Sequence, residues 1–230
     1  MSSKAIAVVL FGGLGKRFNK ETPKQFFSIS DSRTLMGETL SNIANLDCIE
    51  EIIVVSHPSF IEKTKDVIKN ENLKKIAFVI PGGESREESA YNALCYLKSI
   101  GTDEDKIIAI CDGDRPNAME SFFQEAINEA KEKGAIVATI STDSLIYDEQ
   151  GQKYLNRSQV YRVQTPQCFK FKEILEAFEK EKNSLNFYTD EGSIYLKHFP
   201  NISIVKGEER NFKITTMDDY KRYLQERKNQ

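Results

Sequence analysis

The chain has 230 residues, of which 40% are hydrophobic and 29% charged, and its formal net charge at pH 7 is −3. This length is sufficient for one large domain with a sizeable core. The slight acidic excess argues against a general nucleic-acid-binding protein, which normally carries an excess of basic residues. The four cysteines include no C-x-x-C pair and therefore indicate reduced thiols in a cytoplasmic protein.

A membrane protein is not expected either. The N-terminal stretch MSSKAIAVVLF lacks the apolar core of a cleavable signal peptide. No later apolar run is long enough to span a bilayer.

Short apolar runs alternate with helical patterns over the first 140 residues. The predicted strands are 5–11, 51–56, 75–80, 106–111 and 135–140, and the predicted helices are 34–47, 58–71, 85–100 and 118–133. Ser85 and Glu88 form a capping-box pattern at the start of the third helix. Continuous apolar strands that alternate with helices predict an α/β protein, a three-layer αβα sandwich around a mostly parallel sheet.

The alternation ends after Ile140. Residues 141–163 are polar, and we expect them to protrude as a loop or hairpin. Helices near 171–182 and 190–198, a strand at 202–207 and a final helix from about 216 are predicted to follow. The sequence therefore predicts a single domain, 1–230, with 141–163 as a protruding arm.

Ligands of such sheets bind beyond the carboxyl ends of the strands, so the loops there are the candidate site. LFGGLGKRF does not fit the dinucleotide fingerprint, because Phe18 occupies the position of the third glycine, and it does not fit a P-loop, because Arg17 follows Gly15-Lys16. What remains is a glycine loop whose N–H groups can approach an anion, with Arg17 and Lys24 as added charge. The alternative is a tight turn with solvated charges.

Four later segments each have a purely structural interpretation. In CDGDRPN, Asp112 and Asp114 could approach Mg²⁺ or sugar hydroxyls, or form an Asp-Gly turn with an Asp–Arg ion pair. PGGESREES is consistent with a simple strand-to-helix turn, TDEG with a helix N-cap, and NFKITT with a strand that exposes Lys213. None of these segments is decisive alone.

Histidine is nearly absent, since the chain has only His57 and His198, and neither lies in these loops. A Ser-His-Asp or Cys-His nucleophile and a His-based zinc site are therefore not expected. Lys, Arg, backbone N–H groups and Mg²⁺ suit phosphoryl or nucleotidyl transfer, in which positioning and charge neutralisation dominate.

Seven blocks of the sequence, taken in order, resemble the cytidylyltransferases that act on polyol phosphates. They are GGLGKRF, PKQF, GGESREES, DGDRP, QTPQ, TDE and NFKIT. That family includes 2-C-methyl-D-erythritol 4-phosphate cytidylyltransferase and ribitol-5-phosphate cytidylyltransferase, and the resemblance covers about the whole chain. It implies a Rossmann-like nucleotidyltransferase fold. It also implies CTP and a polyol phosphate as substrates, a CDP-polyol and pyrophosphate as products, Mg²⁺ or another divalent cation, and a homodimer formed through the arm.

The resemblance further implies three groups of site residues. The catalytic cations at the α-phosphate are Arg17, Lys24 and Lys213. The residues that hold the nucleotide are Gly12, Gly13, Gly15, Gly82, Gly83, Arg86 and Ser89. The residues that hold the acceptor are Asp112, Arg115, Ser144, Arg157, Thr165 and Thr189, and Asp112 is also the metal candidate beside an ion held largely by phosphates.

Some positions depart from the family pattern. Phe11 stands where alanine is usual, and Asp114 adds a second carboxylate to the DGDRP block. Thr-Asp-Glu at 189–191 favours methylerythritol phosphate as the acceptor, with ribitol 5-phosphate or another polyol phosphate of surface polysaccharides as the alternative.

Two other classes remain as alternatives. QTPQ and TDE argue against a sugar-1-phosphate nucleotidylyltransferase. The retained Arg17, Lys24 and Lys213 argue against a CTP-binding regulatory protein without catalysis.

Overall fold

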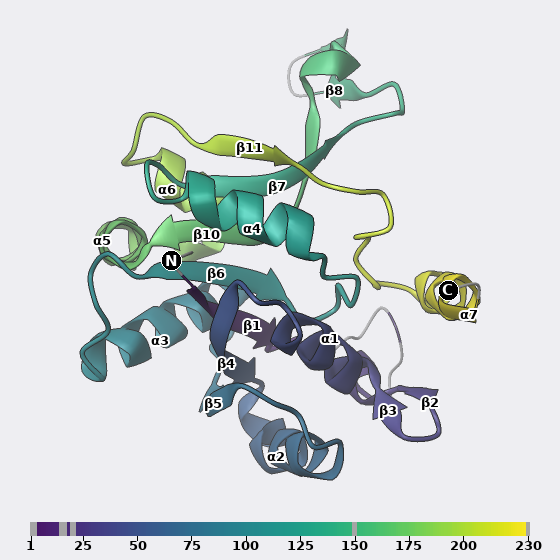
Figure 1. Cartoon of the computed structure of the whole chain (residues 1–230). Coiled ribbons are helices and arrows are strands. Elements are labelled where there is room, and N and C mark those ends of the chain that lie inside the picture. Colours follow the sequence, from purple (N-terminus) through teal and green to yellow (C-terminus); the bar gives the residue numbers. More distant parts are fainter. Residues whose placement is uncertain (1–3, 14–17, 19–21, 149–150, 229–230) are drawn as a thin grey trace.

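The computed structural model describes residues 4–13, 18, 22–148 and 151–228. Among these, seven strands form a central sheet in the order β11-β7-β10-β6-β1-β4-β5 (Figure 1). They are β1 (Ala5–Phe11), β4 (Ile49–Ser56), β5 (Ile76–Pro81), β6 (Ile107–Asp112), β7 (Ala135–Ile140), β10 (Tyr161–Lys170) and β11 (Ser203–Lys206). Neighbouring strands are parallel except at β10, which runs antiparallel to both β6 and β7.

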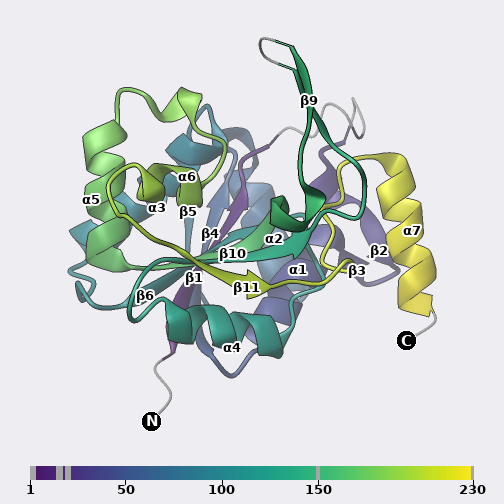
Figure 2. The same ribbon diagram turned by 90° about the horizontal axis from the view of Figure 1, so that it is seen from above.

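Helices cover both faces of the sheet (Figure 2). Side chains of α1 (Leu35–Ala44) and α4 (Glu120–Glu129) pack in the core of one face, and α2 (Ile61–Asn70) adds partly buried residues there. On the opposite face lie α3 (Arg86–Ser99), α5 (Phe171–Glu181) and α6 (Glu191–Leu196). The predicted αβα sandwich with a mostly parallel sheet is confirmed.

The alternation of side chains along β1 divides the core between the two faces. Ala5, Ala7, Val9 and Phe11 belong to the cluster beside α1 and α4, and Ile6, Val8 and Leu10 belong to the cluster beside α3 and α5. All seven residues are buried, which explains why this strand is a continuous apolar run.

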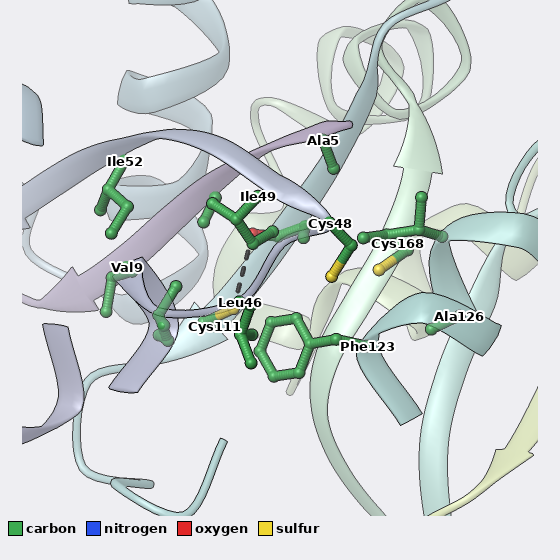
Figure 3. Close-up of a cluster of buried hydrophobic side chains, with 14 of the residues drawn as sticks. Ala5, Val9, Leu46, Cys48, Ile49, Ile52, Cys111, Phe123, Ala126 and Cys168 are labelled. Atoms are coloured by element: carbon green, nitrogen blue, oxygen red, sulfur yellow. Dashed lines mark hydrogen bonds between the residues drawn. The ribbon is translucent and has the colours of Figure 1, made fainter. Parts of the chain in front are cut away.

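Three of the four cysteines, all free thiols, are buried in the cluster beside α1 and α4 (Figure 3). Burial raises the pKa of the Cys48 thiol to about 12 and raises the pKa of Cys168 further. Because the thiolate is the reactive form, these cysteines act as small apolar core residues.

One central strand was not predicted. In β10, residues 161–163 and 167–168 pair with β7, and residues 167–170 pair with β6 on the other side. The register with β7 shifts between Val163 and Gln167. Pro166 lies in this unpaired stretch, where its missing N–H costs no ladder hydrogen bond. The proline interrupts the strand pattern in the sequence, although the sheet accommodates it.

The segment NFKITT was expected as a strand and forms none. Its polar groups instead bond to the loops around the site. The Asn211 side chain donates to Gln164 Oε1 (3.2 Å) and to the Thr165 carbonyl (3.0 Å), and the Ile214 N–H donates to the Asp114 carbonyl (2.9 Å). A backbone whose hydrogen bonds are satisfied in this way needs no neighbouring strand.

Two smaller units lie outside the sandwich. Within the predicted arm, β8 (Ile146–Asp148) and β9 (Gln152–Tyr154) form an antiparallel hairpin that protrudes from the sheet (Figure 1). The C-terminal helix α7 (Met217–Lys228) packs through Tyr220 and Tyr223 in a cluster with Ile29 of β2 (Ser28–Ser30), which pairs with β3 (Arg33–Thr34). No helix within the described residues is long and apolar enough to cross a membrane.

The turn after β6 is packed tightly against β1. A Cβ on Gly113 would lie 2.3 Å from Cε1 of Phe11 and 2.7 Å from the Leu10 carbonyl oxygen. The Phe11 ring therefore lies against the Gly113 backbone, in the core cluster beside α1 and α4.

We expect Gly113→Ala to lower the free energy of unfolding by about 1–3 kcal/mol, because ring and backbone would both have to shift. Urea denaturation measures this. Gly13→Ala is the matched control, since a Cβ there meets nothing within 4 Å. An unchanged midpoint for Gly113→Ala would contradict the packing described.

Candidate active site

A cleft of about 310 Å³ opens at the carboxyl ends of β1 and β6, beside the N-terminus of α3. Its lining brings together predicted site residues from distant parts of the sequence: Gly12, Gly13, Lys24, Gly83, Arg86, Ser89, Asp112 and Lys213. This is the edge of a parallel sheet where ligands bind in doubly wound folds.

Asp112, the last residue of β6, is the centre of the charged network in this cleft. Its backbone N–H donates to Thr165 Oγ1 (3.1 Å), which fixes the end of the strand. Oδ1 accepts from Arg86 Nε (3.0 Å), and Oδ2 accepts from Arg115 Nε (3.1 Å) and Lys213 Nζ (3.3 Å). Burial by itself would raise the pKa of Asp112, but Arg86, Lys213 and Arg115 hold it well below its usual value. Asp112 therefore stays ionised and gathers three cations.

Glu191, the first residue of α6, holds Arg86 from the other side. It is fully buried, and its Oε1 accepts from Arg86 Nη1 (2.7 Å), while Oε2 has no hydrogen-bond partner within the described part of the chain. Burial raises the pKa of Glu191, and the Arg86 guanidinium opposes that shift. Arg86 thus joins three elements, α3, β6 and α6.

Glu191 was not among the predicted site residues, because TDEG also fits a helix N-cap. That cap exists: Asp190 Oδ1 accepts from the Ser193 N–H (2.8 Å). The signal that could have identified Glu191 is its place in the Thr-Asp-Glu block shared with the family.

Lys24 lies across the cleft in a short 3-10 helix, Lys24–Phe26. Its ammonium donates to Asp114 Oδ2 and to the Ile214 carbonyl (2.9 Å). Lys213 Nζ lies 3.8 Å from Asp114 Oδ1. The two predicted catalytic lysines within the described residues therefore meet around one carboxylate.

Ser89 fixes the two glycine turns against each other. Its Oγ accepts from the Gly83 N–H (3.0 Å) and donates to the Ser85 carbonyl (2.8 Å). A Cβ on Gly12 would lie 2.9 Å from this Oγ, and a Cβ on Gly82 would lie 2.8 Å from it. Both positions need glycine for this close approach.

The N-terminus of α3 lies at the cleft, since Ser85 and Arg86 are among the residues that line it. Ser85 Oγ accepts from the Glu88 N–H (3.0 Å), as the capping-box pattern predicts. The Glu88 carboxylate differs from the pattern, since it accepts from the Glu84 N–H (2.8 Å) instead of that of Ser85.

Several predicted residues lie elsewhere. Gly15 and Arg17 are outside the described residues. Ser144 and Arg157 are exposed on the arm, where Arg157 Nη1 donates to the Thr142 carbonyl (3.1 Å), and Thr189 is exposed before α6. These three do not line the described cleft. Gly82, Arg115 and Thr165 are not among its lining residues either, although Arg115 and Thr165 bond to Asp112, which is.

Both oxygens of Asp112, the metal candidate, already accept hydrogen bonds from cations. Within the described ranges, no three His, Cys, Asp or Glu residues are grouped so that they could hold a metal ion. The donor set thus fits an ion that arrives with phosphate oxygens and water as its main ligands, as Mg²⁺ commonly does.

We expect Glu191→Ala to destabilise the fold by about 2 kcal/mol, because Arg86 would lose a charged acceptor in a buried position. Glu191→Gln keeps an acceptor oxygen and should lose less. Urea denaturation of both variants tests this, and an unfolding midpoint for Glu191→Ala equal to that of the unmodified chain would contradict the anchoring role of Glu191.

The comparison with known proteins agrees with this geometry. The family model described as "IspD: 2-C-methyl-D-erythritol 4-phosphate cytidylyltransferase" matches residues 5–223. The 2-C-methyl-D-erythritol 4-phosphate cytidylyltransferase of Thermosipho africanus is 36% identical over 217 residues, which are 93% of this chain and 94% of that protein. The enzyme of the same name from Petrotoga mobilis is 33% identical over 219 residues, 93% of this chain and 94% of that protein.

A solved structure shows the same fold. The crystal structure of 4-diphosphocytidyl-2C-methyl-D-erythritol synthase from Anaerococcus prevotii superposes with a TM-score of 0.77 at 27% identity, covering 96% of each chain. The sequence matches span nearly the whole length of both proteins. The chain belongs to the 2-C-methyl-D-erythritol 4-phosphate cytidylyltransferase (IspD) family of nucleotidyltransferases.

Proposed function

We propose that this enzyme transfers CMP from CTP to the phosphate of 2-C-methyl-D-erythritol 4-phosphate and releases pyrophosphate. The observation that carries the proposal is the cleft in which Asp112 gathers Arg86, Arg115 and Lys213, in a chain that matches this family from residue 5 to residue 223. The cleft offers cations and helix N–H groups, which are the groups that recognise phosphates.

In the proposed reaction, an oxygen of the acceptor phosphate attacks the α-phosphorus of CTP in line with the bond to the β-phosphate. The new P–O bond forms as the bond to pyrophosphate breaks. The acceptor is already anionic near neutral pH, so the step needs no general base, and its barrier lies in bringing two anions together. Lys24 and Lys213, with Arg17 outside the described residues, offset this repulsion and the charge of the transition state.

We assign the nucleotide to the α3 side of the cleft. Gly12, Gly13 and Gly15 approach the triphosphate, and the turn at Gly82 and Gly83 receives the cytosine and ribose. Ser89 supports that assignment, because it holds both glycine segments in place through contacts within the protein. Arg86 is held by Asp112 and Glu191, so its contribution there is an oriented positive charge.

The acceptor is assigned to Asp112, Arg115, Thr165 and Thr189, together with Ser144 and Arg157 of the arm. Because Arg157 is exposed and does not line the described cleft, we propose a homodimer in which the arm of one protomer serves the site of the other. Support comes from Ile146 and Tyr154, which are paired in the arm hairpin and remain 51% and 71% exposed. Such apolar side chains on a protruding hairpin are typical of an interface.

A divalent cation, most simply Mg²⁺, completes the proposal. It enters with the triphosphate, and its ligands are largely phosphate oxygens, near the carboxylate of Asp112. When bound, it supplies further neutralisation of phosphate charge.

Pyrophosphate release tests the reaction directly. The chain is incubated with Mg²⁺, each of CTP, ATP, GTP and UTP, and either methylerythritol phosphate or ribitol 5-phosphate. We expect release with CTP and methylerythritol phosphate, and loss of release with EDTA. Activity only with ribitol 5-phosphate would reassign the acceptor, and binding of CTP without release from any pair would favour a regulatory protein.

Lys24→Ala should lower kcat by about 100-fold or more, because one cation at the reacting phosphate is removed from a preorganised site. Lys69→Ala, an exposed lysine of α2, is the matched control and should keep the original kcat. Circular dichroism checks the fold of both. A near-normal kcat for Lys24→Ala would refute the catalytic assignment.

The arm prediction is tested by sedimentation equilibrium. The unmodified chain should sediment as a dimer, and Tyr154→Glu should shift it towards monomer and reduce kcat/KM for the acceptor more than for CTP. Phe187→Glu is the control, since Phe187 is 80% exposed and lies outside the arm. A monomeric unmodified chain would contradict the dimer.

A further inference from the structure

Asp114 lies in the wall of the cleft, and no step of the proposed reaction uses it. The residue is 9% exposed, and its Oδ1 has no hydrogen-bond partner among the residues that the structure describes. Its carboxylate nevertheless contacts two proposed catalytic cations, since Oδ2 accepts from Lys24 and Oδ1 lies 3.8 Å from Lys213. The DGDRP block departs from the family pattern at this position.

The backbone around Asp114 is fixed on both sides. The Ile214 N–H donates to the Asp114 carbonyl (2.9 Å), and the Gly113 N–H donates to the Leu10 carbonyl (3.0 Å). A Cβ on Gly113 has no room, so the preceding residue is packed as well. The carboxylate is thus presented to the cleft by a turn that cannot withdraw without breaking these contacts.

A phosphate that approaches Lys24 meets a cation that is already neutralised. Lys24 also donates to the Ile214 carbonyl (2.9 Å), but Asp114 is the charged partner in its described contacts. An arriving phosphate either displaces the carboxylate from Lys24 or binds beside a second negative charge. Both cost binding free energy, and the partly enclosed cleft weakens the screening of that repulsion.

The local charge balance also indicates that Asp114 weakens the attraction for phosphates. Among the described residues of this network, the cations Lys24, Arg86, Arg115 and Lys213 face the carboxylates Asp112, Asp114 and Glu191. Four positive and three negative charges leave a net charge of +1, and a neutral residue at 114 would make it +2.

We propose that Asp114 is a built-in counter-ion that positions Lys24 and Lys213 in the empty cleft and competes with the phosphates of CTP and of pyrophosphate for them. The proposal rests on the proposed function in taking CTP as the nucleotide. Its consequence for the reaction is a weaker hold on the product pyrophosphate, which favours release.

The test is isothermal titration calorimetry of the full chain with CTP and, separately, with pyrophosphate, each with and without Mg²⁺ and with no acceptor present. Asp114→Asn removes the charge and keeps the shape. We expect this variant to bind both anions more tightly than the unmodified chain, by a factor of about five or more. A residue that only supports the fold would weaken binding or leave it unchanged.

Two variants complete the design. Asp66→Asn removes one exposed carboxylate from α2 and should leave binding unchanged, which controls for net charge. In a Lys24→Met background, Asp114→Asn should tighten binding by less than Asp114→Asn alone does. The reason is that Asp114 pairs with both Lys24 and Lys213, and Lys24 is missing from this background.

Equal or weaker binding by Asp114→Asn would overturn the proposal, and weakening confined to the Mg²⁺ titrations would assign Asp114 to the metal instead. The pyrophosphate titration distinguishes a failure of this proposal from a failure of the proposed function. If the unmodified chain binds pyrophosphate but not CTP, the nucleotide assignment fails, while the effect of Asp114 is still measured with pyrophosphate.

Discussion

The ionised carboxylate of Asp112 is the constraint on which the site depends. It ends a fully buried strand, where an unpaired charge would destabilise the fold. Ion pairs with Arg86, Arg115 and Lys213 offset the free energy of desolvating this carboxylate. These cations come from α3, from the turn after β6 and from the segment before α7. A single buried charge thus draws two distant parts of the chain to the turn that follows it, at one edge of the sheet, and orients the side chains there.

Each described cation of this network is paired with a carboxylate. The site is therefore ordered before any substrate arrives, and binding need not first organise long, flexible side chains. The same pairing reduces the attraction for an incoming polyanion. A nucleotidyltransferase has to release pyrophosphate as well as bind CTP, and a site with moderated positive charge suits both requirements.

The fold was largely predictable from the sequence, because its first strands are continuous apolar runs that alternate with helical patterns. β1 and β7 have the predicted bounds. β10 was missed because Pro166 interrupts it, and NFKITT was misassigned because its hydrogen-bond partners are loops distant in sequence. Motif order identified the family, but the partners of Arg86 and Asp114 follow from tertiary packing, and no local pattern encodes that packing.

The segment that carries Lys213 has a consequence for how the enzyme is made. It lies near the C-terminus, and it docks onto residues 112–115 and 164–165 through Asn211, Lys213 and Ile214. A chain still emerging from the ribosome can assemble most of the sheet while this segment is absent. The cation cluster is completed only after this segment has been made, because Lys213 follows all seven strands of the central sheet in the chain. A sheet that has formed without the segment has the scaffold of the site but lacks one of its phosphate-binding charges.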